Sequence, residues 1–184
     1  MRARRNAKPV EKLQSAELLA DWFTESGMFD RAPEVEVAGD NAHGGIASTE
    51  LAEAVELREA IYSLLEARLT HKPLPDEAVT IVNSYAAETP VGIQLVGSQA
   101  AKGGTVRQGL AALARETVEI VGGEDAALLR ECGRPECTQV YLDRSRGHRR
   151  EWCAMRTCGN RVKASNFRAR HQVTATNTPA NAPA

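Results

Sequence analysis

The four cysteines constrain the fold of this chain more than any other feature, because all of them lie between residues 132 and 158. They form two pairs, Cys132 with Cys137 and Cys153 with Cys158, and each pair encloses four residues. Fifteen residues, enough for a strand, a turn and a second strand, separate the pairs. Paired thiolates at this spacing predict a tetrahedral site for one Zn²⁺. Because four protein ligands leave no position for water, we expect a structural zinc that does not catalyse.

Two other interpretations of the cysteines stay open at this point: disulfide bonds and unrelated buried thiols. Disulfides persist in oxidising compartments. The first residues, Met-Arg-Ala-Arg-Arg-Asn, include no apolar segment of the kind that directs export. No stretch approaches the roughly 18 uninterrupted apolar residues of a membrane span. We therefore expect a cytoplasmic protein without membrane contact, in which zinc is favoured over disulfides.

Charge is distributed unevenly along the chain, although the net charge is only −1. Residues 130–171 contain eleven Lys and Arg against four Asp and Glu, whereas the rest of the chain contains twelve against twenty. The C-terminal segment is therefore formally +7, and Zn²⁺ held by four thiolates would lower this charge by two. A basic module joined to an acidic body attracts polyanions, of which nucleic acid is the commonest.

Apolar residues that recur every three or four positions predict four helices before residue 129. The longest stripe covers about 48–69 and predicts a central core helix with Leu57, Ile61, Leu64 and Leu65 buried. Shorter patterns predict helices over about 10–26, 76–87 and 105–121. Their inward residues are expected to be Leu13, Leu18, Leu19, Trp22, Phe23, Val79, Val82, Tyr85, Ala86, Val106, Leu110, Leu113, Val118 and Val121.

The segments outside these helices are rich in the residues of turns and loops. Residues 30–47 predict one loop and residues 97–105 a second, capped by Thr105, while residues 93–96 predict a short strand. We expect a disordered basic arm at 1–9 and a disordered tail at 172–184. The predicted fold class is mainly α: a helical N-terminal domain at 10–129 and a small α+β zinc finger at 130–171.

The zinc module itself combines strand, turn and helix patterns. Residues 139–143 have strand character, residues 143–147 have turn chemistry, and residues 149–152 are expected to return as a second strand. Trp152, next to Cys153, would cover the metal with apolar surface. A helix is expected to start near Cys158. A knuckle, a hairpin and a helix around one metal describe a treble-clef-like or ribbon-like finger.

The tetrapeptide Cys158-Gly-Asn-Arg161 resembles the signature of the CGNR zinc-finger family. In that family the finger commonly follows a helical domain called ABATE, in stress-induced bacterial transcription regulators. The matching positions are the four cysteines, Leu142, Asp143, Ser145, Arg146, Arg150, Trp152, Gly159, Asn160, Arg161 and Lys163. Residues 10–129 resemble the ABATE domain more loosely, through the order and lengths of the predicted helices. This chain lacks the apolar-Asp-Phe-x-Asn-Thr segment with which family members usually begin, so a pocket that this segment helps to line would be altered.

The resemblance and the charge together favour a DNA-binding transcription regulator. Arginine outnumbers lysine ten to one in the module, and arginine suits bidentate contacts with phosphate and guanine. Two roles stay open for Gly159 and Asn160. In the first, Gly159 frees the backbone at the start of the last helix and Asn160 caps that helix. In the second, Asn160 contacts a base directly. The expected nucleic-acid contacts are Arg146, Arg149, Arg150, Asn160, Arg161, Lys163, Arg168 and Arg170, and Arg161, Lys163 and Arg168 are expected to line one face with the arginines of the turn.

An alternative function is a zinc-dependent adaptor that docks an acidic protein partner, since arginine serves acidic proteins as well. A third hypothesis, an enzyme in the helical body, finds no catalytic constellation, so we expect no enzymatic activity. One zinc finger offers a small footprint on DNA, and we therefore expect a homodimer. A small-molecule or protein ligand of the helical domain is a further expectation, as is association with the nucleoid if the protein binds DNA.

Overall fold

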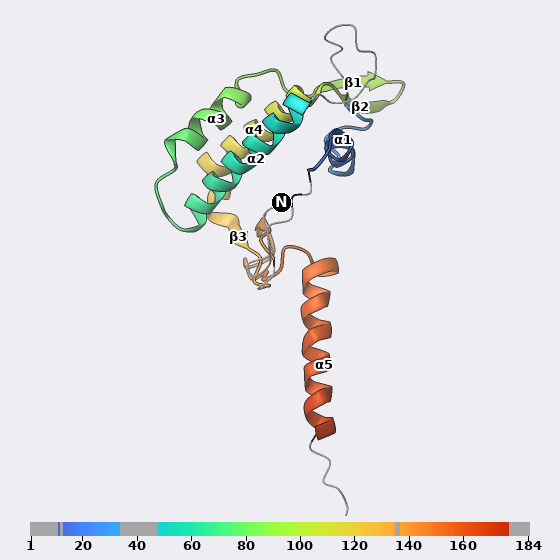
Figure 1. Cartoon of the computed structure of the whole chain (residues 1–184), viewed down its shortest axis with the longest axis vertical. Coiled ribbons are helices and arrows are strands. Elements are labelled where there is room, and N and C mark those ends of the chain that lie inside the picture. Colours follow the sequence, from blue (N-terminus) through green and yellow to red (C-terminus); the bar gives the residue numbers. More distant parts are fainter. Residues whose placement is uncertain (1–10, 12, 34–47, 135–136, 177–184) are drawn as a thin grey trace, which may run out of the picture. The chain divides into compact units, whose positions relative to one another are not determined.

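The computed structural model describes residues 11, 13–33, 48–134 and 137–176 (Figure 1). The described chain divides into two compact units, of which the first ends at Leu129 and the second begins at Arg130. The predicted arm at 1–9, residues 34–47 of the predicted loop and residues 177–184 of the predicted tail lie outside the described residues. Helices dominate both units, so the predicted mainly α fold class is confirmed.

The described part of the first unit contains four α-helices, a hairpin and a short 3₁₀ helix. The α-helices are α1 (Ala16–Glu25), α2 (Ser48–Leu69), α3 (Asp76–Ala86) and α4 (Val106–Gly122). The bounds of α2, α3 and α4 agree with the prediction to within one residue. The predicted start of the first helix near residue 10 is wrong, because α1 begins only after Ser15, which caps it. Strands β1 (Gly92–Val96) and β2 (Gln99–Gly103) stand between α3 and α4, and a short 3₁₀ helix, η1 (Glu124–Leu128), follows α4. None of the helices in the part of the chain described here is long and apolar enough to cross a membrane.

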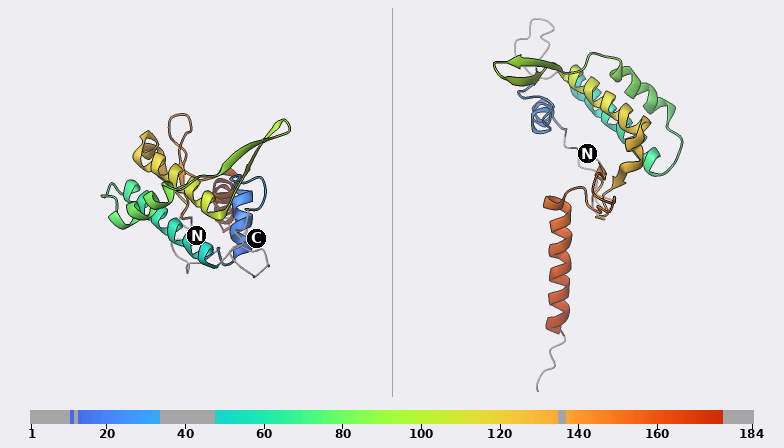
Figure 2. Two further views of the ribbon diagram at one scale, coloured as in Figure 1. Left: turned by 90° about the horizontal axis from the view of Figure 1, so that it is seen from above. Right: turned by 180° about the vertical axis from the view of Figure 1, so that it is seen from behind.

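The core of this unit lies between α2, α3 and α4, which pack side by side, with α1 against α2 (Figure 2). Leu57 and Leu64 are buried as predicted, whereas Ile61 and Leu65 are only partly buried at the edge of the core. The predicted register of α1 is wrong in part. Leu19 and Phe23 point inward, but Leu18 and Trp22 are 44% and 38% exposed. On α4, Val118 was also predicted to point inward and is 42% exposed. The side of each helix that faces the core buries its apolar residues, and apolar residues beside that stripe stay exposed.

Gly109 lets α1 approach α4 closely. A Cβ atom at this position would lie 2.5 Å from Cε1 and 2.9 Å from Cζ of Phe23, and 3.1 Å from Cζ of Phe29. Both rings are fully buried and their centroids are 5.0 Å apart. The missing side chain on α4 therefore provides the space that the two aromatic rings occupy.

Two helix starts are defined by their own side chains. The hydroxyl of Ser15 accepts a hydrogen bond from the Leu18 amide at the start of α1. Thr105 caps α4 as predicted: its hydroxyl accepts from the Gln108 amide, and the Gln108 side chain accepts from the Thr105 amide. This reciprocal pair satisfies amides that an α-helix leaves without partners in its first turn.

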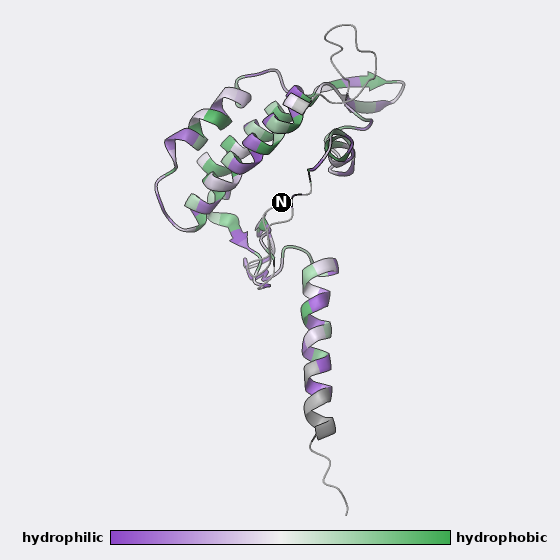
Figure 3. Cartoon of the chain, viewed as in Figure 1, coloured by the Kyte–Doolittle hydropathy of each residue, from purple (hydrophilic) through white to green (hydrophobic). Residues whose placement is uncertain are grey.

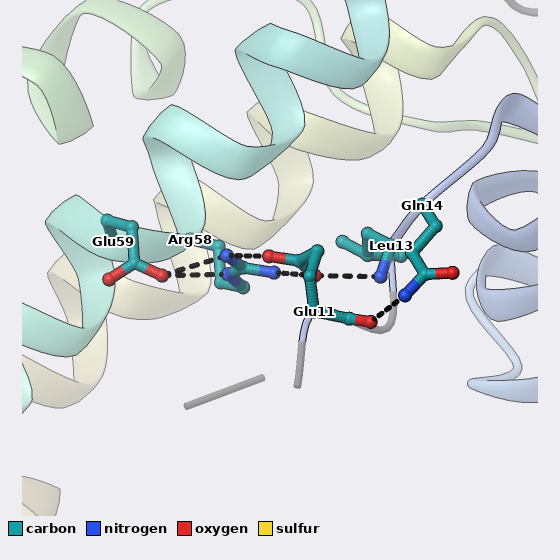
Figure 4. A network of polar contacts seen from close by, with 5 residues as sticks. All are labelled: Glu11, Leu13, Gln14, Arg58 and Glu59. Atoms are coloured by element: carbon teal, nitrogen blue, oxygen red, sulfur yellow. Dashed lines mark hydrogen bonds and ion pairs between the residues drawn. The ribbon is translucent and has the colours of Figure 1, made fainter. Parts of the chain in front are cut away.

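A bidentate ion pair attaches the chain before α1 to the middle of α2 (Figure 4). Both terminal nitrogens of Arg58 donate to the carboxylate of Glu11, each at 2.7 Å, and Arg58 also donates to Glu59. The same carboxylate accepts from the Leu13 amide at 2.8 Å. These hydrogen bonds, led by that from Arg58, lower the pKa of Glu11 to about 2. The segment before α1 is therefore held by charge as well as by apolar packing.

The β1–β2 hairpin differs from the sequence-based prediction of one strand followed by a loop. Residues 99–103 form a second strand, which pairs antiparallel with β1 from Gly92↔Gly103 to Val96↔Gln99. Gly97 occupies the left-handed region at φ +61° in the two-residue turn, as such hairpins require. The small residues of β2 have weak strand propensity, and pairing with β1 overrides it. Figure 3 shows that apolar residues continue onto this hairpin.

The second unit contains β4 (Val140–Leu142), a π-helical turn η2 (Met155–Gly159) and α5 (Asn160–Thr176). Strand β4 pairs with β3 (Leu129–Glu131), and not with residues 149–152 as predicted. Those residues are not a strand, because the Glu151 carbonyl accepts instead from the Gly133 amide at 2.8 Å. Helix α5 also runs five residues past the predicted start of the tail at 172, since no glycine or proline interrupts it before Pro179.

Candidate metal centre and nucleic-acid interface

Two loops of the second unit bring the four cysteines together. Cys132 follows β3, and its amide donates to the Gln139 carbonyl at 2.9 Å, which closes the first loop around Cys137. Cys158 lies in η2, directly before α5, and Cys153 precedes that turn. The Cys153 amide points at the sulfur of Cys132 at 3.4 Å, so a backbone donor links the two loops.

The four sulfur atoms all lie within 4.8 Å of one another. Cys153 Sγ is 3.6 Å from Cys158 Sγ and 3.9 Å from Cys137 Sγ. Tetrahedral zinc with Zn–S bonds of about 2.3 Å places its sulfurs about 3.8 Å apart, whereas a disulfide needs about 2.05 Å. All four cysteines are free thiols. The donor set and its spacing therefore fit one structural Zn²⁺, and the geometry does not fit disulfides.

The electrostatics of the cluster favour a cation. Burial raises the pKa of the Cys153 thiol to about 12 and also raises the pKa of Cys137. Burial opposes ionisation of Cys158 too, but hydrogen bonds from Cys153, Cys137 and Arg134 lower the pKa of Cys158 to about 7. Zinc ligands are thiolates, so a bound divalent cation offsets the cost of ionising closely spaced, partly buried sulfurs. The Arg134 side chain, 3.7 Å from Cys158 Sγ, adds a positive charge that sequence analysis did not assign to the site.

Trp152 packs beside the cysteine loops, which agrees with its expected covering role. A Cβ atom at Gly133 would lie 3.5 Å from the indole, and one at Gly159 would lie 3.2 Å from it and 2.4 Å from the sulfur of Met155. Gly159 is itself buried. A side chain at Gly159 would therefore have to displace the end of the Met155 side chain and press against Trp152.

Asp143 organises the turn between β4 and the second cysteine pair. Its side chain is fully buried and accepts from the Ser145 amide at 3.0 Å, from the Ser145 hydroxyl at 2.5 Å and from the Arg150 amide at 3.0 Å. The hydrogen bond from the Ser145 hydroxyl is the main cause of the lowered pKa of Asp143. His148 has φ +50° and its ring contacts the Asp143 carbonyl at 2.7 Å. One buried carboxylate therefore fixes the turn that displays Arg146 and Arg149.

The predicted nucleic-acid residue Arg150 makes several contacts within the module. Its guanidinium donates to the carbonyls of Trp152 and Cys153 and lies 4.9 Å from the centroid of the Tyr141 ring. The Tyr141 hydroxyl in turn donates to the Arg150 carbonyl. These contacts tie the turn to the chain that carries Cys153. Arg150 thus helps to position the metal loop, and it is exposed like Arg146 and Arg149, so its predicted nucleic-acid contact stays a prediction.

The remaining predicted contacts lie on α5, where nearly every described side chain is exposed. At about 100° per residue, Arg161 and Arg168 share one stripe, and Lys163 and Arg170 share another about 160° away around the axis. The expected single basic face is therefore corrected to two basic stripes. Val162, the only partly buried side chain described in α5, lies on the opposite side of the helix.

Between the two basic stripes runs a middle stripe made of Asn160, Ala164, Phe167 and His171, spaced by three or four residues. The rings of Phe167 and His171 are 4.2 Å apart, and the Phe167 side chain is 56% exposed. Sequence analysis did not single out Phe167, although its spacing from Asn160 would have revealed the stripe. Asn160 has helical torsion angles and does not cap the start of α5 as predicted, because the chain is already helical from Met155.

Comparison with known families gives two matches along the chain. The ABATE family model, described as "Putative stress-induced transcription regulator", matches residues 2–124, about two thirds of the sequence. The CGNR zinc finger model matches residues 129–171. No curated protein matches this chain. The two matches confirm the resemblance stated from the sequence, in the predicted order.

Proposed function

The chain belongs to the ABATE family and carries a CGNR zinc finger, and on this premise we propose that it is a transcription regulator that binds DNA through α5. The observation that carries the proposal is the pair of basic stripes that flank the exposed middle stripe of α5. Zinc held by Cys132, Cys137, Cys153 and Cys158 would fold the module, and the arginine-rich surface would contact DNA.

The dimensions of α5 suit the major groove of DNA. An α-helix with its side chains is about 10–12 Å across, and the major groove is about 12 Å wide. A helix in the groove meets a phosphate backbone on each side. Arg161 and Arg168 would contact one backbone, and Lys163 and Arg170 the other, while the middle stripe faces the base edges. Val162 faces away from the groove in this arrangement.

The middle stripe has the chemistry of base recognition. An asparagine side chain pairs with the N6 and N7 edge of adenine, and an aromatic ring packs against the thymine methyl group. Asn160 and Phe167 would supply these two contacts two helical turns apart. Arg146 and Arg149 on the neighbouring turn would add phosphate contacts, which position the module without reading sequence.

The test is the salt dependence of DNA binding by the zinc-loaded protein, measured with a pool of random duplexes and then with selected sequences. Each neutralised phosphate contributes about −0.9 to the slope of log K against log salt, so four or five contacts give a slope near −4. Arg161→Ala with Arg168→Ala removes one basic stripe and should flatten the slope by about two units. Arg68→Ala with Lys72→Ala, two exposed cations of the helical unit, is the charge-matched control and should leave the slope unchanged.

Phe167→Ala separates base contact from charge, because it changes no charge. It should reduce the preference for the selected sequence over random DNA while the salt slope stays the same. Zinc content must remain at one equivalent in every variant. Loss of affinity in the control as large as in the stripe variant would contradict the proposed interface.

A zinc-dependent adaptor for an acidic protein is the second candidate, supported by the same excess of arginine. It would take the lead if the wild-type protein shows no salt-dependent DNA binding. We keep the expectation that the chain is not an enzyme. Its families are described as a transcription regulator and a zinc finger, and a zinc with four protein ligands has no open position for a substrate. A DNA-binding role would place the protein at the nucleoid.

The footprint of one helix is short, and regulators with one recognition helix commonly bind paired half-sites as dimers. We therefore include a homodimer in the proposal. That the helical unit binds a small molecule or a protein stays a prediction. A ligand that binds the folded unit raises its melting temperature, so measuring this temperature with different classes of metabolites would test the prediction.

A further inference from the structure

The β1–β2 hairpin exposes more apolar surface than any other part of the first unit that the structure describes. Ile93, Leu95 and Val96 are exposed by 69, 78 and 62%, although each is a strand-forming residue. A two-stranded hairpin is marginally stable in water without a further strand or a covering element. An apolar, two-stranded sheet of this kind is therefore a candidate for strand addition.

The outer edge of β2 already has a partner. The Lys102 amide donates to the Asp30 carboxylate at 2.5 Å, and the Asp30 amide donates to the Lys102 carbonyl at 3.0 Å. The backbone groups of Lys102 therefore point away from β1. Hydrogen-bonded and non-hydrogen-bonded residue pairs alternate along an antiparallel ladder. Lys102 and its partner Ile93 therefore form a non-hydrogen-bonded pair within the hairpin.

The outer edge of β1 follows from the same alternation. The Ile93 and Leu95 backbone groups point outward, while those of Gln94 point toward β2. Within the described residues, β2 is the only strand that pairs with β1. The edge of β1 thus offers two amides and two carbonyls to an incoming strand, next to its most exposed side chains.

We infer that β1 pairs with β1 of a second copy of this chain, antiparallel and about a two-fold axis at Gln94. Antiparallel pairing about the middle residue overlaps all five residues of the strand. Ile93 of each copy then lies opposite Leu95 of the other, and these are the residues whose backbone groups point outward. The register therefore forms four hydrogen bonds and two apolar pairs, and makes a four-stranded sheet in the order β2-β1-β1-β2.

The edge chemistry favours a second copy over a different partner. Residues 91–101 carry no charged side chain, in a chain of which 26% is charged. Two identical edges therefore meet without repulsion, and no charge on the strand would select an acidic or basic peptide. Nor does β1 contain a lysine or proline, the residues that commonly protect an edge strand from pairing with its own kind. This inference specifies the homodimer proposed above and does not depend on DNA binding.

The register can be tested by charge at the axis, because Gln94 lies opposite Gln94 of the second copy in the closely spaced, non-hydrogen-bonded type of pair. Gln94→Lys and Gln94→Glu each place two like charges face to face. Each variant alone should raise the dimer dissociation constant about tenfold or more. An equimolar mixture of the two variants should restore a dimer that contains one copy of each. Gln94 is exposed, so neither change should disturb the fold of the monomer.

Sedimentation velocity of the zinc-loaded, full-length protein across the micromolar range measures these species. Ser98→Lys and Ser98→Glu, at the exposed tip of the same hairpin, are the matched controls and should leave the wild-type dimer intact. A monomeric wild-type protein, a dimer that survives Gln94→Lys, or a mixture that fails to restore the dimer would each overturn the inference. A monomer would leave the edge to a strand from another protein, and none of these results would bear on the salt-slope test of DNA binding.

Discussion

Gly109→Ala tests the close approach of α1 to α4 by adding a single methyl group. The added Cβ atom would lie 2.5 Å from Phe23 Cε1, a distance that real Cβ atoms essentially never show. Neither Phe23 nor Phe29 has free space beside it, because both are buried to within 1% of their surface. The helix or the rings must therefore shift.

Two effects of opposite sign decide the result. Alanine is favoured over glycine in a helix interior by about 1 kcal/mol. Overpacking a filled core typically costs about 1–3 kcal/mol. Because both rings are buried, we expect the upper part of that range, so Gly109→Ala should destabilise the first unit by about 1–2 kcal/mol in net terms.

Gly122→Ala is a control in the same helix, since no atom lies within 4 Å of a Cβ placed there. It should be neutral or stabilising by less than about 1 kcal/mol. Urea unfolding of the zinc-loaded protein, followed by far-UV circular dichroism, measures both free energies, because the four helices of the first unit dominate the helical signal. Phe23→Leu in the Gly109→Ala background should recover part of the loss, because the smaller side chain vacates the space of the ring edge.

Equal stability of the two alanine variants would refute the close packing of α1 on Gly109. A loss in Gly109→Ala that Phe23→Leu does not reduce would place the conflict elsewhere in the core.

Two further predictions concern the ion pair and the metal. The pKa of Glu11 is lowered from 4.5 to about 2, chiefly by the hydrogen bond from Arg58, so its stabilisation is present above pH 4.5 and is lost as the pH falls toward 2. Because the Glu11 side chain is 40% exposed, we discount this shift to about 1 kcal/mol. Glu11→Gln should therefore lower the free energy of unfolding at neutral pH and flatten its decrease in acid, as measured by urea titrations at several pH values. Cys153→Ser should abolish stoichiometric zinc in metal analysis and unfold the second unit, while the helical signal of the first unit persists; retention of one zinc equivalent would contradict the four-cysteine site.

Helical segments were predictable because their apolar spacing reflects burial directly. The exposed side of α1 was not, because Leu18 and Trp22 fit the same three- and four-residue spacing as Leu19 and Phe23. The packing of α1 against the rest of the unit, including Phe23 against Gly109 of α4, decides which pair turns inward. Strand β2 was missed for a related reason: its small residues have no strand signal of their own and become a strand through pairing with β1.

The candidate metal site was predictable because thiolates at paired spacing have few other uses in a chain of this kind. The surroundings of the metal were harder to predict. Asp143 and Arg150 matched the family pattern, but their roles depend on hydrogen bonds across the turn, which spacing alone does not specify. The strand pairing of the module also differed, because the backbone of residues 149–152 is used by the cysteine loops and by Asp143.

The junction between the metal site and α5 determines which side of the helix is presented. A rotation of α5 by one residue, about 100°, would bring Val162 toward the groove and move the basic stripes out of position. Cys158 is buried in the last turn before α5, and the Gly159 amide donates to the Ala154 carbonyl within the same turn. Gly159 also lies close to Trp152 and Met155, which leave little space for a side chain at that position. A metal bound by Cys158 therefore fixes the rotation of the helix about its own axis, and the CGNR tetrapeptide joins the last ligand to Asn160 and Arg161, the first residues of the middle stripe and of one basic stripe.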